Sequence, residues 1–147
     1  MEVTSIDDYK ARVEEILGAE FANGEINLSL AADSVGEAKN LHKRLVLQQK
    51  QLRQVKREIN NDMKHIRALH KQASANAQPS GGSLIMGLFG KKGYQRSDVA
   101  EQRKQLRKAR DNALYPYTEL KQTIDDILVQ MDYGKLTIKE WLEEQKQ

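Results

Sequence analysis

The chain has 147 residues, a formal net charge of +3, 31% charged and 39% hydrophobic residues, and no cysteine, which fits one domain with a thin core. The absence of cysteine excludes disulfides, thiolate nucleophiles and thiolate metal ligands, and it favours a reducing cytoplasmic compartment. No apolar run reaches the roughly 18 residues of a membrane-spanning helix, and the N-terminal sequence lacks the features of a signal peptide, so we expect a cytoplasmic protein.

The low proline content indicates an all-α fold that begins with a short helix over residues 4–18. There are two prolines and nine glycines, five of them between Gly81 and Gly93, and few β-branched runs. Thr4 or Ser5 can cap the short helix, and Gly18 marks its end. Its apolar residues recur at helical spacing.

A second, much longer helix is predicted over residues 30–74. This stretch has no proline, and its only glycine is Gly36. A heptad repeat that starts at Leu41 places apolar residues at eight of ten positions, with Gln48 and Asp62 as the polar exceptions. A helix of this length is typical of a coiled coil.

Residues 75–97 are predicted to form a flexible loop that is apolar and then basic. Glycines on every side of Leu84–Phe89 disfavour a stable helix or strand there. The residues that could contact a partner or a membrane are Leu84, Ile85, Met86, Leu88, Phe89, Lys91 and Lys92.

A second long helix is predicted over residues 98–132, and a short one over 137–146. Asp98 and Glu101 can form a capping box, and Pro116 is expected to kink the helix. Two long helices joined by a loop most simply fold back on each other. The predicted fold is therefore a long antiparallel helical hairpin with the short terminal helices packed at its open end.

The C-terminal segment contains a further set of helix-end signals. Gly134 can end one helix, and Thr137 with Glu140 can cap the next. The pattern Asp132-x-Gly134-x-Leu136-Thr137-x-x-Glu140-Trp141 resembles the bacterial short C-terminal domain family called SHOCT, in which Phe usually stands at the position of Trp141. The resemblance covers residues 120–146. It implies a prokaryotic or phage origin and an interaction or oligomerisation role without catalysis.

The sequence contains no recognisable catalytic, cofactor or metal site. His65 and His70 are five residues apart, a spacing that does not place two metal ligands on one helix face. The adjacent carboxylates, such as Asp125 and Asp126, point to different faces. The glycine-rich loop lacks the spacing of a phosphate-binding P-loop. We therefore expect a protein that is not an enzyme and holds no cofactor.

Positive charge is concentrated in the middle of the chain. Residues 36–110 carry eighteen Lys or Arg and five Asp or Glu, a net charge of +13, whereas residues 1–35 carry −6 and residues 111–147 carry −4. This segregation predicts a surface that faces an anion. The candidate residues are Arg53, Lys56, Arg57, Lys64, Arg67, Lys71, Arg96, Arg103, Lys104, Arg107, Lys108 and Arg110.

Three functions fit this pattern. The first is a scaffold or adaptor whose basic, apolar-tipped hairpin binds a protein partner, with homo-oligomerisation as an option. The second is binding to the backbone of nucleic acid, without sequence reading, because stacking aromatics are scarce. The third is docking on an anionic membrane by insertion of residues 84–89.

Overall fold

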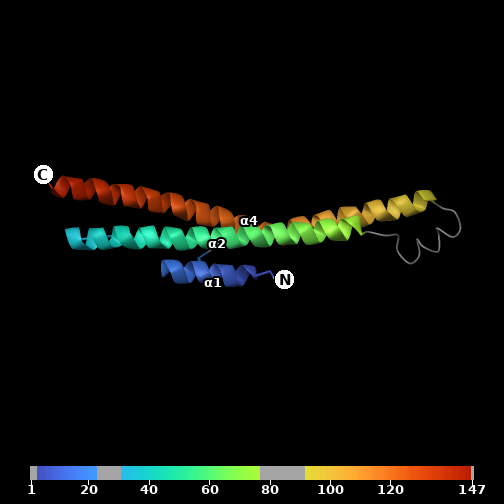
Figure 1. Cartoon of the computed structure of the whole chain (residues 1–147), viewed down its shortest axis with the longest axis horizontal. Coiled ribbons are helices and arrows are strands. Elements are labelled where there is room, and N and C mark those ends of the chain that lie inside the picture. Colours follow the sequence, from blue (N-terminus) through green and yellow to red (C-terminus); the bar gives the residue numbers. More distant parts are fainter. Residues whose placement is uncertain (1–2, 23–30, 77–91, 147) are drawn as a thin grey trace. The chain divides into compact units, whose positions relative to one another are not determined.

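The computed structural model of the chain describes residues 3–22, 31–76 and 92–146, with the side chains of 92–98 excepted. Within these residues the chain forms three helices, α1 (Ile6–Leu17), α2 (Val35–Ala75) and α4 (Lys92–Gln145), and no β-strand (Figure 1). The predicted all-α class is thus confirmed. Of the loop predicted over residues 75–97, residues 77–91 lie outside the described part of the chain, whereas Ala75 ends α2 and residues 92–97 belong to α4.

Two compact units share the long helices. Unit 1 comprises residues 1–61 and 117–147, and unit 2 comprises residues 62–116. Each of α2 and α4 therefore contributes one segment to each unit, and the division within α4 falls directly after Pro116.

In unit 1, α1 has a well-defined beginning and end. The Ser5 hydroxyl accepts a hydrogen bond from the Asp8 backbone N–H at 3.2 Å, which satisfies one of the free donors of the first turn. At the other end, Gly18 has a φ of 65°, and its N–H donates to the Glu14 carbonyl at 2.8 Å. Glycine takes this left-handed conformation without steric cost. The buried residues of α1 are Tyr9 and Val13.

The core of unit 1 lies between α1, α2 and α4. Along α2 and α4 the contacts pair Gln49 with Asp132 and Lys56 with Asp125, so the two segments are antiparallel. Apolar side chains fill the space between these contacts, and their burial provides most of the favourable free energy. The buried apolar residues are Tyr9, Val13, Ala38, Leu41, Leu45, Leu52, Val55, Ile59, Leu120, Ile124, Ile127, Met131 and Ile138.

Polar contacts attach α1 to the two long helices in unit 1. Tyr117 donates its hydroxyl to the Thr4 carbonyl at 2.8 Å, and its ring packs edge-on against Tyr9 with 6.2 Å between centroids. Arg12 forms an ion pair with Glu58 of α2. The short helix is therefore packed against both α2 and α4 within unit 1.

The core of unit 2 is small. Met63, Ile66 and Leu114 are its buried apolar residues among those described, whereas Leu69 and Tyr115 are 49% and 62% exposed. The Arg103 side chain of α4 donates to the Ser74 carbonyl of α2 at 3.4 Å.

Helix α2 begins at Val35 rather than at residue 30. The Ser34 hydroxyl accepts from the Glu37 N–H at 3.1 Å, and the Glu37 carboxylate accepts from the Asp33 N–H at 2.8 Å. This is nearly the reciprocal arrangement of a capping box, which favours a helix start at this point. The motif Ser34-x-x-Glu37 is visible in the sequence.

Helix α4 is longer than predicted at both ends. It begins at Lys92 rather than at residue 98, and it continues through Gly134 to Gln145, so residues 137–146 do not form a separate helix. A glycine inside a helix costs only about 1 kcal/mol. Met131 and Ile138, two turns apart on either side of Gly134, are both buried, and their packing keeps the helix continuous there.

The buried face of α2 also differs from the heptad prediction. Gln49 and Met63 are buried in place of Gln48 and Asp62, and Leu69 and Ala73 are exposed. An α-helix repeats every 3.6 residues, so a fixed step of 3.5 drifts off the buried face over several turns.

Candidate anion-binding pocket

The residues predicted for the apolar tip lie largely outside the described part of the chain. Leu84, Ile85, Met86, Leu88, Phe89 and Lys91 fall within residues 77–91. Lys92 and Arg96 lie at the beginning of α4, but their side chains are not among those described. The role of this segment remains a prediction.

The predicted basic surface divides between the two units. Arg53, Lys56 and Arg57 belong to unit 1, where Lys56 forms an ion pair with Asp125 of α4. Lys56 is therefore already neutralised by a local partner. The other described members belong to unit 2, and they are Lys64, Arg67, Lys71, Arg103, Lys104, Arg107, Lys108 and Arg110.

Unit 2 concentrates the positive charge of the protein. Its sequence contains eleven Lys or Arg and four Asp or Glu, a net charge of +7, whereas unit 1 contains thirteen and seventeen, a net charge of −4. A local excess of this size attracts anions and raises their concentration near the surface.

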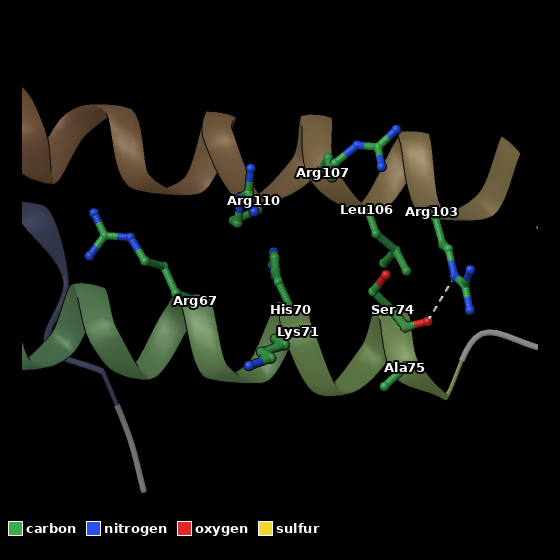
Figure 2. Close-up of a pocket in the computed structure, with 9 residues that line it drawn as sticks. All are labelled: Arg67, His70, Lys71, Ser74, Ala75, Arg103, Leu106, Arg107 and Arg110. Atoms are coloured by element: carbon green, nitrogen blue, oxygen red, sulfur yellow. Dashed lines mark hydrogen bonds between the residues drawn. The ribbon is translucent and has the colours of Figure 1, made fainter. Parts of the chain in front are cut away.

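A pocket of about 510 Å³ lies between the α2 and α4 segments of unit 2 (Figure 2). Five of the predicted basic residues line it, two from α2 and three from α4. Three of the four other lining residues are small or apolar, and the fourth is a histidine. The full lining is Arg67, His70, Lys71, Ser74, Ala75, Arg103, Leu106, Arg107 and Arg110.

Helical spacing explains why these residues meet. On α2, Arg67, Lys71 and Ser74 are separated by four and three residues, and on α4 the same holds for Arg103, Arg107 and Arg110. Residues three or four apart share one helix face. In Figure 2 the residues from Arg67 to Ala75 run opposite those from Arg110 to Arg103, so the two basic faces border one pocket.

Most of the pocket's positive charge has no acidic partner. Arg110 forms an ion pair with Asp111, its neighbour in sequence, at 3.1 Å. In the described part of the chain, no other ion pair involves Arg67, Lys71, Arg103 or Arg107. Guanidinium groups present rigid, paired donors that match phosphate and carboxylate oxygens, so the pocket is suited to an anion with several oxygens.

The Nε2 atom of His70 is a buried polar atom without a hydrogen-bond partner among the residues that the structure describes. Figure 2 shows the His70 side chain rising from α2 toward Arg110 on α4. A buried polar atom left without a partner costs about 1 to 3 kcal/mol, and in native proteins such an atom usually has a water or ion partner. From the sequence, His70 is considered only as a metal ligand, although its position between Arg67 and Lys71 on one helix face points to the pocket.

In the described ranges, no group of three His, Asp or Glu side chains could hold a metal ion. No helix within those ranges is long and apolar enough to cross a membrane. The pocket with the clearest chemical character is thus the basic one in unit 2.

Comparison with protein-family models, with curated proteins and with solved structures finds no match to this chain.

Proposed function

We propose that this protein is a non-enzymatic, cytoplasmic interaction protein, a scaffold or adaptor, that holds an anionic partner in the basic pocket of unit 2. The observation that carries the proposal is the set of five cationic side chains around one pocket, of which only Arg110, with Asp111, has an ion pair within the described part of the chain. Gathering like charges in one place opposes folding through mutual repulsion. A bound anion relieves that repulsion.

Backbone binding to nucleic acid is the second candidate, and the composition of the pocket favours it. Four of its five cations are arginine, the residue best suited to bidentate contacts with phosphate. Insertion of residues 84–89 into a membrane and homo-oligomerisation stay predictions from the sequence. The SHOCT resemblance of residues 120–146 agrees with an interaction role and with a prokaryotic origin.

The experiment compares retention of the full chain on an immobilised sulfated polysaccharide as sodium chloride is raised. The test variant is the pair Arg103→Gln and Arg107→Gln, both at the pocket. The matched control is the pair Lys104→Gln and Lys108→Gln, which removes the same charge from exposed positions of the same helix segment outside the pocket.

We expect the wild type and the control to elute at similar salt concentrations and the pocket variant to elute clearly earlier, because counterion release depends on the cations that contact the anion. Failure of the wild type to bind at 50 mM salt would contradict the proposal. Equal losses in both variants would show that diffuse charge, and not the pocket, holds the anion.

A further inference from the structure

We infer that the anion in this pocket is a run of phosphates on a nucleic-acid backbone, and that His70 contacts one of their oxygens through Nε2. This inference rests on the proposed function and specifies the partner. Three observations lead to it: the length of the basic faces, the residue types around the pocket, and the unpartnered nitrogen of His70.

The length of the basic faces matches a short run of phosphates. Arg67 and Ser74 are seven residues apart on α2, and so are Arg103 and Arg110 on α4. At 1.5 Å per residue, each face extends about 10 Å. Successive phosphates of one DNA strand rise by about 3.4 Å along the axis, so the pocket spans about three of them.

The residue types of the pocket favour a polymer backbone over a free nucleotide. A site that recognises a single nucleotide stacks its base on an aromatic ring or contacts the edge of the base. His70 is the one ring among the nine lining residues, and it lies between two cationic residues on α2. The pocket is therefore built to hold phosphate and sugar, which gives binding without sequence preference.

The same lining disfavours a membrane surface as the partner. Docking on a lipid leaflet combines cations with apolar side chains that enter the acyl region. Leu106 and Ala75 are the apolar residues of the pocket, and Figure 2 shows Leu106 pointing toward Ser74 of the facing helix and not outward. A lipid phosphate could enter the pocket, but no apolar contact there would hold the bilayer.

His70 provides a contact beyond charge attraction alone. Its Nε2 is buried and lacks a hydrogen-bond partner among the described residues. Arg67, Arg103 and Arg107 are exposed residues, and movement of their guanidinium groups toward a bound anion would open the space over the imidazole ring. Nε2, in the tautomer that carries its proton there, can then donate a hydrogen bond to a phosphate oxygen, which satisfies the nitrogen.

The test measures binding of the full chain to a fluorescent 20-base-pair DNA duplex by anisotropy, at pH 8 and between 50 and 200 mM sodium chloride. Two duplexes of unrelated sequence should bind equally. Three phosphate contacts predict a salt slope of about −2.7, which is roughly a 40-fold loss of affinity over this range. Arg107→Gln should reduce the slope by about 1, whereas Lys104→Gln should reduce it less.

The His70→Leu variant tests the contact through Nε2. It should bind DNA about 3- to 10-fold more weakly than the wild type, with the salt slope unchanged, because a hydrogen bond is lost but no phosphate contact is. His70→Gln keeps a polar group near the same place and should recover part of the loss. Thermal unfolding of both variants by circular dichroism controls for damage to unit 2.

The remaining outcomes distinguish a failure of this inference from a failure of the proposed function. Wild-type affinity in His70→Leu, or equal binding of polyglutamate and DNA, would overturn the inference while leaving an anion-binding pocket. Binding to phosphatidylserine vesicles but not to DNA would overturn the choice of partner. Absence of binding to all three polyanions would overturn both proposals.

Discussion

The side-chain amide of Gln49 on α2 donates hydrogen bonds to the Asp132 carboxylate at 2.7 Å and to the Leu128 carbonyl at 3.3 Å on α4. Gln49 is the buried polar residue in a row of apolar ones, with 1% of its surface exposed. A buried polar group of this kind stabilises a helix pair only in the register that satisfies it. The Gln49 to Asp132 contact therefore fixes how α2 and α4 align within unit 1.

Two substitutions of Gln49 should show how its side chain affects the free energy of unfolding. Gln49→Leu should change the free energy of unfolding by no more than about 1 kcal/mol, because both the donor and its desolvation cost are removed and Asp132 can turn to water. Gln49→Glu should destabilise by at least about 2 kcal/mol, because it buries a carboxylate beside another one. Urea unfolding measures both, and a Gln49→Leu variant as unstable as Gln49→Glu would contradict this account.

The same contact predicts a dependence of stability on acid pH. The pKa of Asp132 is lowered, most of all by the hydrogen bond from Gln49; burial opposes this effect, and the positive charges of Lys135 and Arg53 lower the pKa further. A carboxyl whose folded pKa is lowered stabilises the fold at pH values above its unfolded pKa, and that contribution is lost as pH falls through the folded value.

The loss should therefore occur below about pH 4, where an unfolded aspartate takes up its proton. We expect the melting temperature of the wild type to fall more steeply below pH 4 than that of Asp132→Asn. Asp126→Asn, an exposed change on the same helix, is the control and should follow the wild type. Parallel curves for all three proteins would show that the carboxylate makes no pH-dependent contribution.

Local signals predicted α1 correctly, since its caps at Ser5 and Gly18 depend on residues within the helix itself. The heptad positions from Leu52 to Ile59 were also correct, because a short helical stretch stays in phase with a heptad repeat. The basic residues of the pocket were selected by charge alone. These features could be predicted because each depends on few neighbours.

Features that depend on distant contacts could not be predicted in this way. Gly134 looked like a helix end, but burial of Met131 and Ile138 on either side outweighs its helix cost. Gln49 is buried instead of Gln48, and its side chain is satisfied there by Asp132 of the facing helix. The involvement of His70 in the pocket likewise requires the facing residues of α4.

The contacts of Tyr117 with Thr4 and Tyr9 predict how much the packing of α1 contributes to the free energy of unfolding. Tyr117→Phe keeps the edge-on packing against Tyr9 but removes the hydroxyl that donates to the Thr4 carbonyl, and it should cost about 1 kcal/mol. Tyr9→Ala empties a position that is 1% exposed and should cost about 3 to 5 kcal/mol. Urea unfolding gives both values, and equal costs would show that ring packing adds little.

Replacement of glycine by alanine should have opposite effects on stability at Gly36 and Gly18, two glycines of unit 1. Gly36 lies in the first turn of α2, where an added Cβ would come no closer than 4.0 Å to the Ser34 hydroxyl oxygen, so Gly36→Ala should stabilise by about 0.5 to 1 kcal/mol. Gly18→Ala should destabilise by about 1 kcal/mol, because alanine is strained at its φ of 65°. Thermal unfolding measures both shifts, and a gain at Gly18 would contradict the assigned cap.

Removal of the pocket's acidic neighbour should strengthen anion binding. Asp111 pairs with Arg110 at 3.1 Å, and its side chain is 68% exposed, so the pair itself adds little to stability. Asp111→Asn frees the Arg110 guanidinium for a ligand and adds one positive charge beside the pocket. At 50 mM salt the DNA duplex should bind roughly 2- to 4-fold more tightly, and the gain should shrink as salt screens the added charge.

The control is Asp33→Asn, which makes the same charge change at an exposed position of unit 1 and should leave the affinity for DNA unchanged. Equal gains in both variants would show that net charge, and not the pocket, sets the affinity.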